Sequence, residues 1–194
     1  MVLNVSIEKS TVVVVEGIDD RILLNYLCDK WDLSNVQFVS INQTPNFDNI
    51  LAVINMPGFH QIVKAFGIIR DADDQFQSAK QSVEDILHRL DLNIKTGHFI
   101  FPDNNNPGRL ETLLMQASLV DADRMNCVDH FMTCLARKSI NISDHRMDKA
   151  KVYTYLSAFD EPGKRIGEAA CAGYWNHSNE VFNNLRIFLF SLAN

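Results

Sequence analysis

A run of four consecutive valines, residues 12–15, constrains the fold more than any other feature of the sequence. β-Branched residues favour strands, and an apolar run without alternation is typical of a strand that is covered on both faces. Covering both faces of a sheet requires helices on each side, which is the arrangement of open parallel α/β sheets. We therefore predict an α/β protein with a strand at residues 12–15.

The first half of the chain continues to alternate between strand and helix patterns, whereas the part after Gly108 is almost entirely helical. We expect a mostly parallel, Rossmann-like sheet flanked by helices in residues 1–120, and a helical C-terminal extension in residues 121–194 packed on the same core. The predicted strands are 12–15, 36–41, 65–71 and 98–101, and the predicted helices are 19–31, 47–65 with a break at Pro57-Gly58, 75–91, 110–119, 121–139, 148–158 and 179–192.

The 194 residues, of which 46% are hydrophobic, suit one soluble domain of ordinary size. No stretch approaches the ~18 apolar residues of a membrane span, and the first ten residues lack the pattern of a secretory signal. The cysteines show no C-x-x-C spacing. We expect a cytoplasmic protein without membrane contact, whose cysteines are reduced and buried, namely Cys28, Cys127, Cys134 and Cys171.

Acidic residues follow three of the predicted strands. Because ligands of open parallel sheets bind beyond the carboxyl ends of the strands, these acids are expected to gather in one small volume. The three clusters are Glu16 with Asp19 and Asp20, then Asp71 with Asp73 and Asp74, then Asp103 with Glu111.

Carboxylates packed this closely repel one another unless some are protonated or a cation lies between them. Mg²⁺ and Mn²⁺ are hard cations that prefer oxygen ligands, so the pattern favours a divalent metal site. Asp71 and Asp73 form a D-x-D spacing, which can place two carboxylates on one side of a strand end. Glu16 directly follows the valine strand and belongs to the same set, whereas Asp19 and Asp74 fit helix capping or solvated surface better.

The motifs around these acids resemble the Toprim domain family. VVVVEGIDDRILLNYL is similar to its first motif, a strand followed by Glu-Gly and a helix, and FGIIRDADD is similar to its second motif, a strand followed by Asp-x-Asp. The resemblance is closest to small stand-alone Toprim-like proteins of unknown function related to the Toprim half of OLD-type (overcoming lysogenization defect) nucleases. PGRLETLL resembles a later acidic segment of those proteins, and the resemblance covers residues 10–117.

The resemblance implies a Toprim-like α/β fold that binds one or two Mg²⁺ or Mn²⁺ ions. It assigns a metal-binding or acid/base role to Glu16 and a metal-binding role to the other acids, which are Asp20, Asp71, Asp73 and Glu111. OLD-type proteins also use a later lysine in catalysis. Lys149 and Lys151 are the candidates for it, and Lys149 is the better match.

Three further residues near the acids are candidates for substrate binding. Gly17 is expected to let the backbone turn sharply or approach a phosphate. Arg70 and Arg109 flank the acids, where they either contact phosphate or balance the local negative charge.

Two functional hypotheses follow. The first is a metal-dependent phosphodiesterase that acts on nucleic acid, DNA before RNA, as a nuclease in phage defence or DNA processing. The second is a non-catalytic Toprim-like module that binds metal or nucleic acid and serves a partner ATPase. The net charge of −6 and the missing G-x-x-x-x-G-K-[ST] phosphate loop favour the second. The sequence leaves the oligomeric state open, including a homo-oligomer.

Overall fold

A four-stranded, fully parallel sheet forms the centre of the computed structural model, which describes residues 6–118 and 121–194. The strands are β1 (Thr11–Val15), β2 (Val36–Ser40), β3 (Ala65–Asp71) and β4 (Lys95–Phe101), in the order β2-β1-β3-β4. Val12 pairs with Gln37 on one side and with Phe66 on the other, so β1 is an interior strand. The predicted α/β class with a parallel sheet is confirmed.

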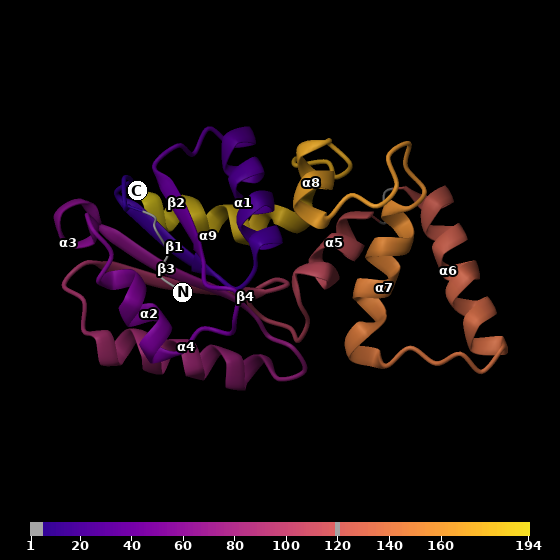
Figure 1. Ribbon diagram of the computed structural model, residues 1–194, viewed down its shortest axis with the longest axis horizontal. Helices are drawn as coiled ribbons and strands as arrows, with labels where there is room; N and C mark the ends of the chain where they lie inside the picture. Colours follow the sequence, from indigo (N-terminus) through magenta and orange to yellow (C-terminus); the bar gives the residue numbers. More distant parts are fainter. Residues whose placement is uncertain (1–5, 119–120) are drawn as a thin grey trace.

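Helices cover both faces of this sheet, as the valine run predicted. The described helices are α1 (Ile18–Lys30), α2 (Phe47–Ile54), α3 (Phe59–Ile62), α4 (Phe76–Leu90), α5 (Leu110–Ser118), α6 (Ala122–Arg137), α7 (Asp144–Leu156), α8 (Ile166–Cys171) and α9 (Asn183–Ala193). Figure 1 shows α2 and α4 on one face of the sheet and α1 and α9 on the other.

The two faces of β1 serve two separate apolar clusters. Val13 and Val15 belong to the cluster under α1 and α9, and Val12 and Val14 belong to the cluster under α2 and α4. All four valines are fully buried. A continuous apolar run is therefore required here, because alternation would bury a polar side chain on one face.

The C-terminal helix α9 returns to the sheet. It lies over Gly67 and Gly97, which are register partners in β3 and β4. A Cβ atom added at Gly67 would lie 2.7 Å from Leu192 of α9, so the absence of a side chain permits this close approach. Helices α6 and α7 instead lie side by side beyond the sheet, connected to it through α5 and α8 (Figure 1).

Several boundaries differ from the predicted ones. Strand β4 begins at Lys95 rather than at residue 98. Residues 95–97 lack an apolar pattern, but they pair with β3 and so belong to the strand. Helix α7 begins at Asp144 rather than at 148, and α9 begins at Asn183 after a short 3₁₀ helix, Glu180–Phe182. The short helix α8 was not predicted. The predicted domain boundary at 120/121 and the end of the helix predicted at 110–119 involve residues outside the described ones.

The expected burial of the cysteines is wrong for three of them. Cys28 is buried in α1, whereas Cys127, Cys134 and Cys171 are exposed on helix surfaces. Within residues 6–118 and 121–194, no helix combines the length and the apolar content that crossing a membrane requires.

Candidate active site

The order in which the chain adds strands to the sheet reverses between β1 and β3. From β1 it passes through α1 to β2 at one edge, and then crosses through α2 and α3 to β3 on the other side of β1. In open α/β sheets such a switch point leaves a crevice beyond the carboxyl ends of the two strands. Glu16 follows β1 at this point, and Asp71 ends β3.

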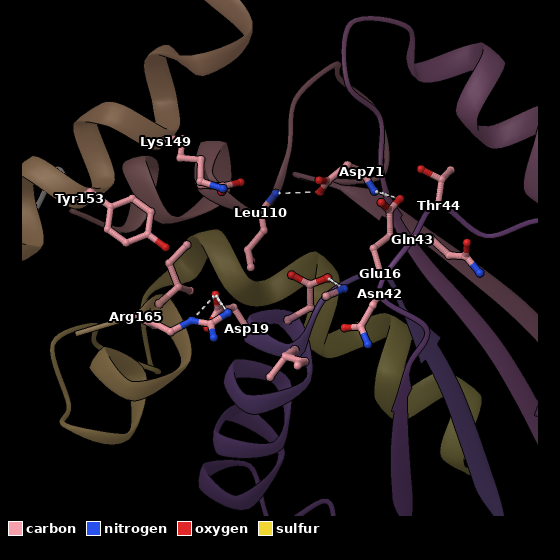
Figure 2. Close-up of a pocket in the computed structure, with 15 residues that line it drawn as sticks. Glu16, Asp19, Asn42, Gln43, Thr44, Asp71, Leu110, Lys149, Tyr153 and Arg165 are labelled. Carbon is pink, nitrogen blue, oxygen red and sulfur yellow. Dashed lines mark hydrogen bonds and ion pairs between the residues drawn. The ribbon is translucent and has the colours of Figure 1, made fainter. Parts of the chain in front are cut away.

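A cavity of about 450 Å³ occupies this crevice (Figure 2). Its acidic lining comes from three segments: the end of β1 with the start of α1, the end of β3, and the first turn of α5. The side chains of α7 and α8 form a second wall, and the loop after β2 forms a third. The lining residues are Glu16, Gly17, Ile18, Asp19, Asp20, Asn42, Gln43, Thr44, Asp71, Leu110, Glu111, Lys149, Tyr153, Arg165 and Ile166.

Backbone groups hold two of the acids in place. The N–H of Asp71 donates to Glu16 Oε1 at 3.3 Å, and the N–H of Leu110 donates to Asp71 Oδ1 at 3.0 Å. Leu110 begins α5, so Asp71 accepts one of the N–H groups that a helix leaves unpaired at its start. The carboxylate of Asp71 therefore connects β3 to α5 while it lines the cavity.

Asp20 is fixed by its own helix. The N–H of Gly17 donates to Asp20 Oδ2 at 2.7 Å, which caps the start of α1. Gly17 itself has extended backbone angles, φ −111° and ψ 165°, so the expected sharp turn is absent. Gly17 lines the cavity without a side chain that would separate a ligand from its backbone.

The acids interact electrostatically within the cavity. Burial raises the pKa of Asp71 well above its usual range, and the charges of Glu16, Asp20 and Glu111 raise it further. Burial also raises the pKa of Glu16, although the Arg70 guanidinium opposes this shift. The pKa of Asp20 is raised by burial against the effect of the Gly17 N–H. Burial is the largest cause of all three shifts, and neighbouring carboxylates add to each of them.

Asp73 does not line the cavity, unlike its D-x-D partner. Its backbone is in the left-handed region with φ 52°, and its carboxylate forms an ion pair with Arg109 at 2.6 Å. The N–H of Gly108 donates to the Asp73 carbonyl at 2.8 Å. Asp73 therefore connects the loop after β3 to the loop before α5. Of the two carboxylates of the motif, only that of Asp71 lines the cavity.

The two arginines proposed for substrate binding do not line the cavity either. Arg70 Nε donates to the carbonyl of Asp71 at 3.2 Å and lies 3.8 Å from Glu16 Oε1. Arg109 pairs with Asp73. Of the two alternatives for these residues, the structure supports balancing of local negative charge.

Lys149 and Lys151 are separated by the structure. Lys149 lines the cavity and lies 3.9 Å from Glu111, whereas Lys151 forms an ion pair with Asp129 of α6 at 2.9 Å. Only Lys149 is therefore placed where it can act on a ligand in the cavity.

Sequence reasoning missed the wall made by α7 and α8. Asp19 was expected to cap a helix or face solvent, but its carboxylate binds the Arg165 guanidinium at 3.0 Å. Tyr153 lines the cavity beside them. The only sequence signal for Tyr153 is its position one helical turn after Lys149, and no signal points to Arg165 in a loop 146 residues from Asp19.

The donor set was compared with what a metal ion requires. Among residues 6–118 and 121–194, no group of three or more His, Cys, Asp or Glu side chains stands in an arrangement that could hold a metal ion. Five acids line the cavity, and Asp19 is paired with Arg165. The other four nevertheless supply carboxylate oxygens, which suits a hard divalent cation. Their uncompensated charge is what such a cation would neutralise.

Comparison with protein-family models places the chain in a family. A family model described as "Protein of unknown function (DUF3226)" matches residues 10–194. The chain belongs to the DUF3226 family. No curated protein matches the sequence.

Solved structures provide a likeness in fold for this DUF3226 member. The C-terminal region of the Burkholderia pseudomallei OLD protein has a TM-score of 0.57 at 16% identity, over 97% of this chain and 100% of that one. The C-terminal region of the Xanthomonas campestris pv. campestris OLD protein has a TM-score of 0.54 at 14% identity, over 95% of this chain and 94% of that one. The expected likeness to OLD-type proteins is confirmed at the level of the fold.

Proposed function

We propose that this chain is a Toprim-type, metal-dependent phosphodiesterase that cleaves nucleic acid, with DNA as the first substrate to test. The observation that carries the proposal is the convergence of four carboxylates, besides the Arg165-paired Asp19, from three chain segments on one cavity at the switch point of the sheet. The fold likeness to the C-terminal regions of OLD proteins supports it.

Glu16, Asp20, Asp71 and Glu111 would hold one or two Mg²⁺ or Mn²⁺ ions. A divalent cation bound there supplies electrophilic stabilisation of the charge that develops on the phosphate oxygens. Asp73 is not included, because its carboxylate is engaged by Arg109 outside the cavity.

Two side chains suit the proton transfers and the charge of phosphodiester cleavage. Burial raises the pKa of Glu16, so its carboxylate would be a stronger base than an exposed glutamate if the other three acids, and not Glu16, hold the ion. Lys149 stands at the edge of the cavity with 63% of its side chain exposed, where its ammonium group can approach a phosphate. Asp71 and Asp20 hold positions fixed by backbone N–H groups.

The test combines metal binding with cleavage. Calorimetric titration of Mn²⁺ should show saturable binding to the wild type, and Asp71→Asn should lose it while it keeps the oxygen that accepts the Leu110 N–H. The same substitution should abolish Mn²⁺-dependent nicking of plasmid DNA. Asp74→Asn is the matched control, because it removes an equal charge from an exposed neighbour. Undiminished nicking by Asp71→Asn would refute the mechanism.

One observation favours the second hypothesis, a non-catalytic module that serves a partner ATPase. The acids among the described residues line the cavity without forming a closed group around a metal position. Binding of Mn²⁺ with no cleavage of single- or double-stranded DNA or RNA would support this alternative. Cleavage that appears only when an ATPase partner is added would support it as well.

A further inference from the structure

The wall of the cavity opposite the acids carries an aromatic side chain. Tyr153 lies one helical turn after Lys149 on α7, and 37% of it is exposed. Its hydroxyl points into the cavity (Figure 2), and within residues 6–118 and 121–194 it has no hydrogen-bond partner. Burial raises the pKa of this hydroxyl, as do the charges of Asp19 and Glu111.

Tyr153 is not needed to pack α7 against the protein. Val152, directly before it, and Tyr155, two positions after it, have exposures of 0% and 3% and belong to the main apolar cluster. Tyr155 also packs edge-on against Phe159. The helix thus places one tyrosine in the core and presents the other to the cavity.

The guanidinium of Arg165 lies next to Tyr153 and is held in place by Asp19. Both Nε and Nη2 of Arg165 donate to the same oxygen, Oδ2 of Asp19, at 3.3 and 3.0 Å. Asp19 Oδ1 also accepts the N–H of Gly167, which fixes the start of α8. A guanidinium has five N–H donors, and Asp19 accepts from two of them, so three are left that can donate to an anionic ligand.

The third wall suggests that the ligand is longer than one nucleotide. Asn42, Gln43 and Thr44 are exposed and uncharged, and they line the cavity on the side away from α7. Asn42 and Gln43 also line a second cavity of about 440 Å³, formed by the loop after β2 and by α2. The two cavities share these two side chains, and Asp48 is the one acid in the otherwise amide and apolar lining of the second. We call the run from Arg165 and Tyr153, past the acids, to this second cavity the path.

We propose that this path binds a single-stranded segment of nucleic acid, in which Tyr153 stacks on the base beside the scissile phosphate and Arg165 contacts the next phosphate. The inference rests on the proposed function and specifies its substrate. A base can stack on a tyrosine ring only when it is unpaired or extruded, so a duplex is a poorer ligand. Backbone contacts from Arg165 are independent of sequence.

The experiment measures binding separately from cleavage. The probe is a fluorescein-labelled strand of ten thymidines, followed by fluorescence anisotropy in Ca²⁺. Tyr153→Leu should weaken binding by roughly five- to a hundredfold, the range of one lost base stack, and Tyr153→Phe should bind like the wild type. A strand of ten abasic units should bind the wild type and Tyr153→Leu equally. Phe131→Leu, which alters another exposed helix aromatic, is the matched control and should change nothing.

The role of Arg165 is tested by the salt dependence of binding. Arg165→Gln should weaken binding to all strands alike and reduce the slope of log K against log salt by about one, as the loss of one phosphate contact does. Thermal unfolding of each variant shows whether the fold is kept. An unchanged salt slope would overturn the role of Arg165.

The outcomes separate this inference from the proposed function. Tyr153-dependent binding without any cleavage in Mn²⁺ by the wild type would refute hydrolysis and retain the stacking site. Mn²⁺-dependent cleavage with equal binding by Tyr153→Leu, or with a duplex bound as tightly as the single strand, would overturn the stacking site and retain hydrolysis.

Discussion

The carboxylate of Glu16 accepts a hydrogen bond from the backbone N–H of Asp71, although the two residues are 55 positions apart in the chain. The bond joins the ends of β1 and β3, the two strands that border the switch point of the sheet. It brings two half-buried acids together in the lining of one cavity. Repulsion between two neighbouring carboxylates opposes folding, so placing both at one cavity points to a role other than stability.

Replacing Asp71 by asparagine should therefore stabilise the protein in the absence of divalent ions. The asparagine oxygen can still accept the Leu110 N–H, and the buried charge is removed. We expect the free energy of unfolding at pH 7 to increase on the order of 1 kcal/mol, as stabilising changes at functional sites often do. Urea unfolding in EDTA measures it, and a destabilised Asp71→Asn would contradict the assignment of Asp71 as an uncompensated charge.

Stability should also depend on pH in a defined direction. The pKa values of Glu16, Asp20 and Asp71 are raised in the folded state from ordinary values of 4.5, 3.8 and 3.8, so the folded state binds their protons more tightly. Their contribution to stability is fully present below these ordinary values and is lost as the pH rises through the raised ones. Urea unfolding from pH 4.5 to 8 should show a decline.

Subtracting the free energy of unfolding of Asp71→Asn from that of the wild type cancels the contributions of the other titrating groups. The free energy of unfolding of the wild type minus that of Asp71→Asn should become more negative with increasing pH over the same interval. A difference that stays constant, or that grows in favour of the wild type, would show that the pKa of Asp71 is not raised.

The two acids of the D-x-D motif should differ in metal binding. Asp73 is paired with Arg109 outside the cavity, so Asp73→Asn should change the Mn²⁺ affinity by less than about threefold. Asp71→Asn should lower the affinity by at least about tenfold, which is the lower end of the loss seen when even an outer-shell partner of a metal ligand is removed. Calorimetric titration gives both values. Equal losses would mean that Asp73 leaves Arg109 and enters the site when metal binds.

Much of this arrangement follows from the sequence, for identifiable reasons. The valine run required a strand covered on both faces, and strand-terminal acids in a parallel sheet had to meet at one edge. Glu16 and Asp71 were therefore predictable from pattern alone. The division of Asp71 from Asp73 was not, because it depends on a left-handed backbone at Asp73 and an ion pair with Arg109, 36 residues away.

The wall formed by α7 and α8 was the least predictable part. Helix α8 has only six residues, too few for a periodic pattern to be read. The contact of Asp19 with Arg165 depends on how α8 packs on α1, which is a tertiary property. The lysine resemblance pointed to α7 and favoured Lys149, and the structure places Lys149, rather than Lys151, at the cavity.

That distinction is testable with a pair of equal substitutions. Lys149→Gln should lower the rate of Mn²⁺-dependent cleavage by roughly a hundredfold, the effect of losing one group that stabilises developing charge, without weakening Mn²⁺ binding. Lys151→Gln breaks only a surface ion pair with Asp129 and should leave the rate unchanged. Single-turnover cleavage measures both, and the opposite ranking would place Lys151 at the site.

The packing of α8 on α1 should be sensitive to a single methyl group. A Cβ atom added at Gly167 would lie 2.6 Å from Cβ of Ile22, an atom that cannot move without its backbone. Gly167→Ala should therefore lower the free energy of unfolding by about 1–3 kcal/mol, as overpacking does. It should also weaken oligonucleotide binding, because α8 carries Arg165 at its start and Asp19 accepts the Gly167 N–H.

Gly163→Ala is the matched control for this change. Its added methyl group would meet nothing within 4 Å, and only its φ of +90° opposes an alanine, at a cost of about 1–2 kcal/mol. Both variants are expected to lose stability in urea unfolding, but only Gly167→Ala should lose affinity for the strand of ten thymidines. If Gly167→Ala keeps wild-type affinity, the position of Arg165 does not depend on the contact between α8 and α1.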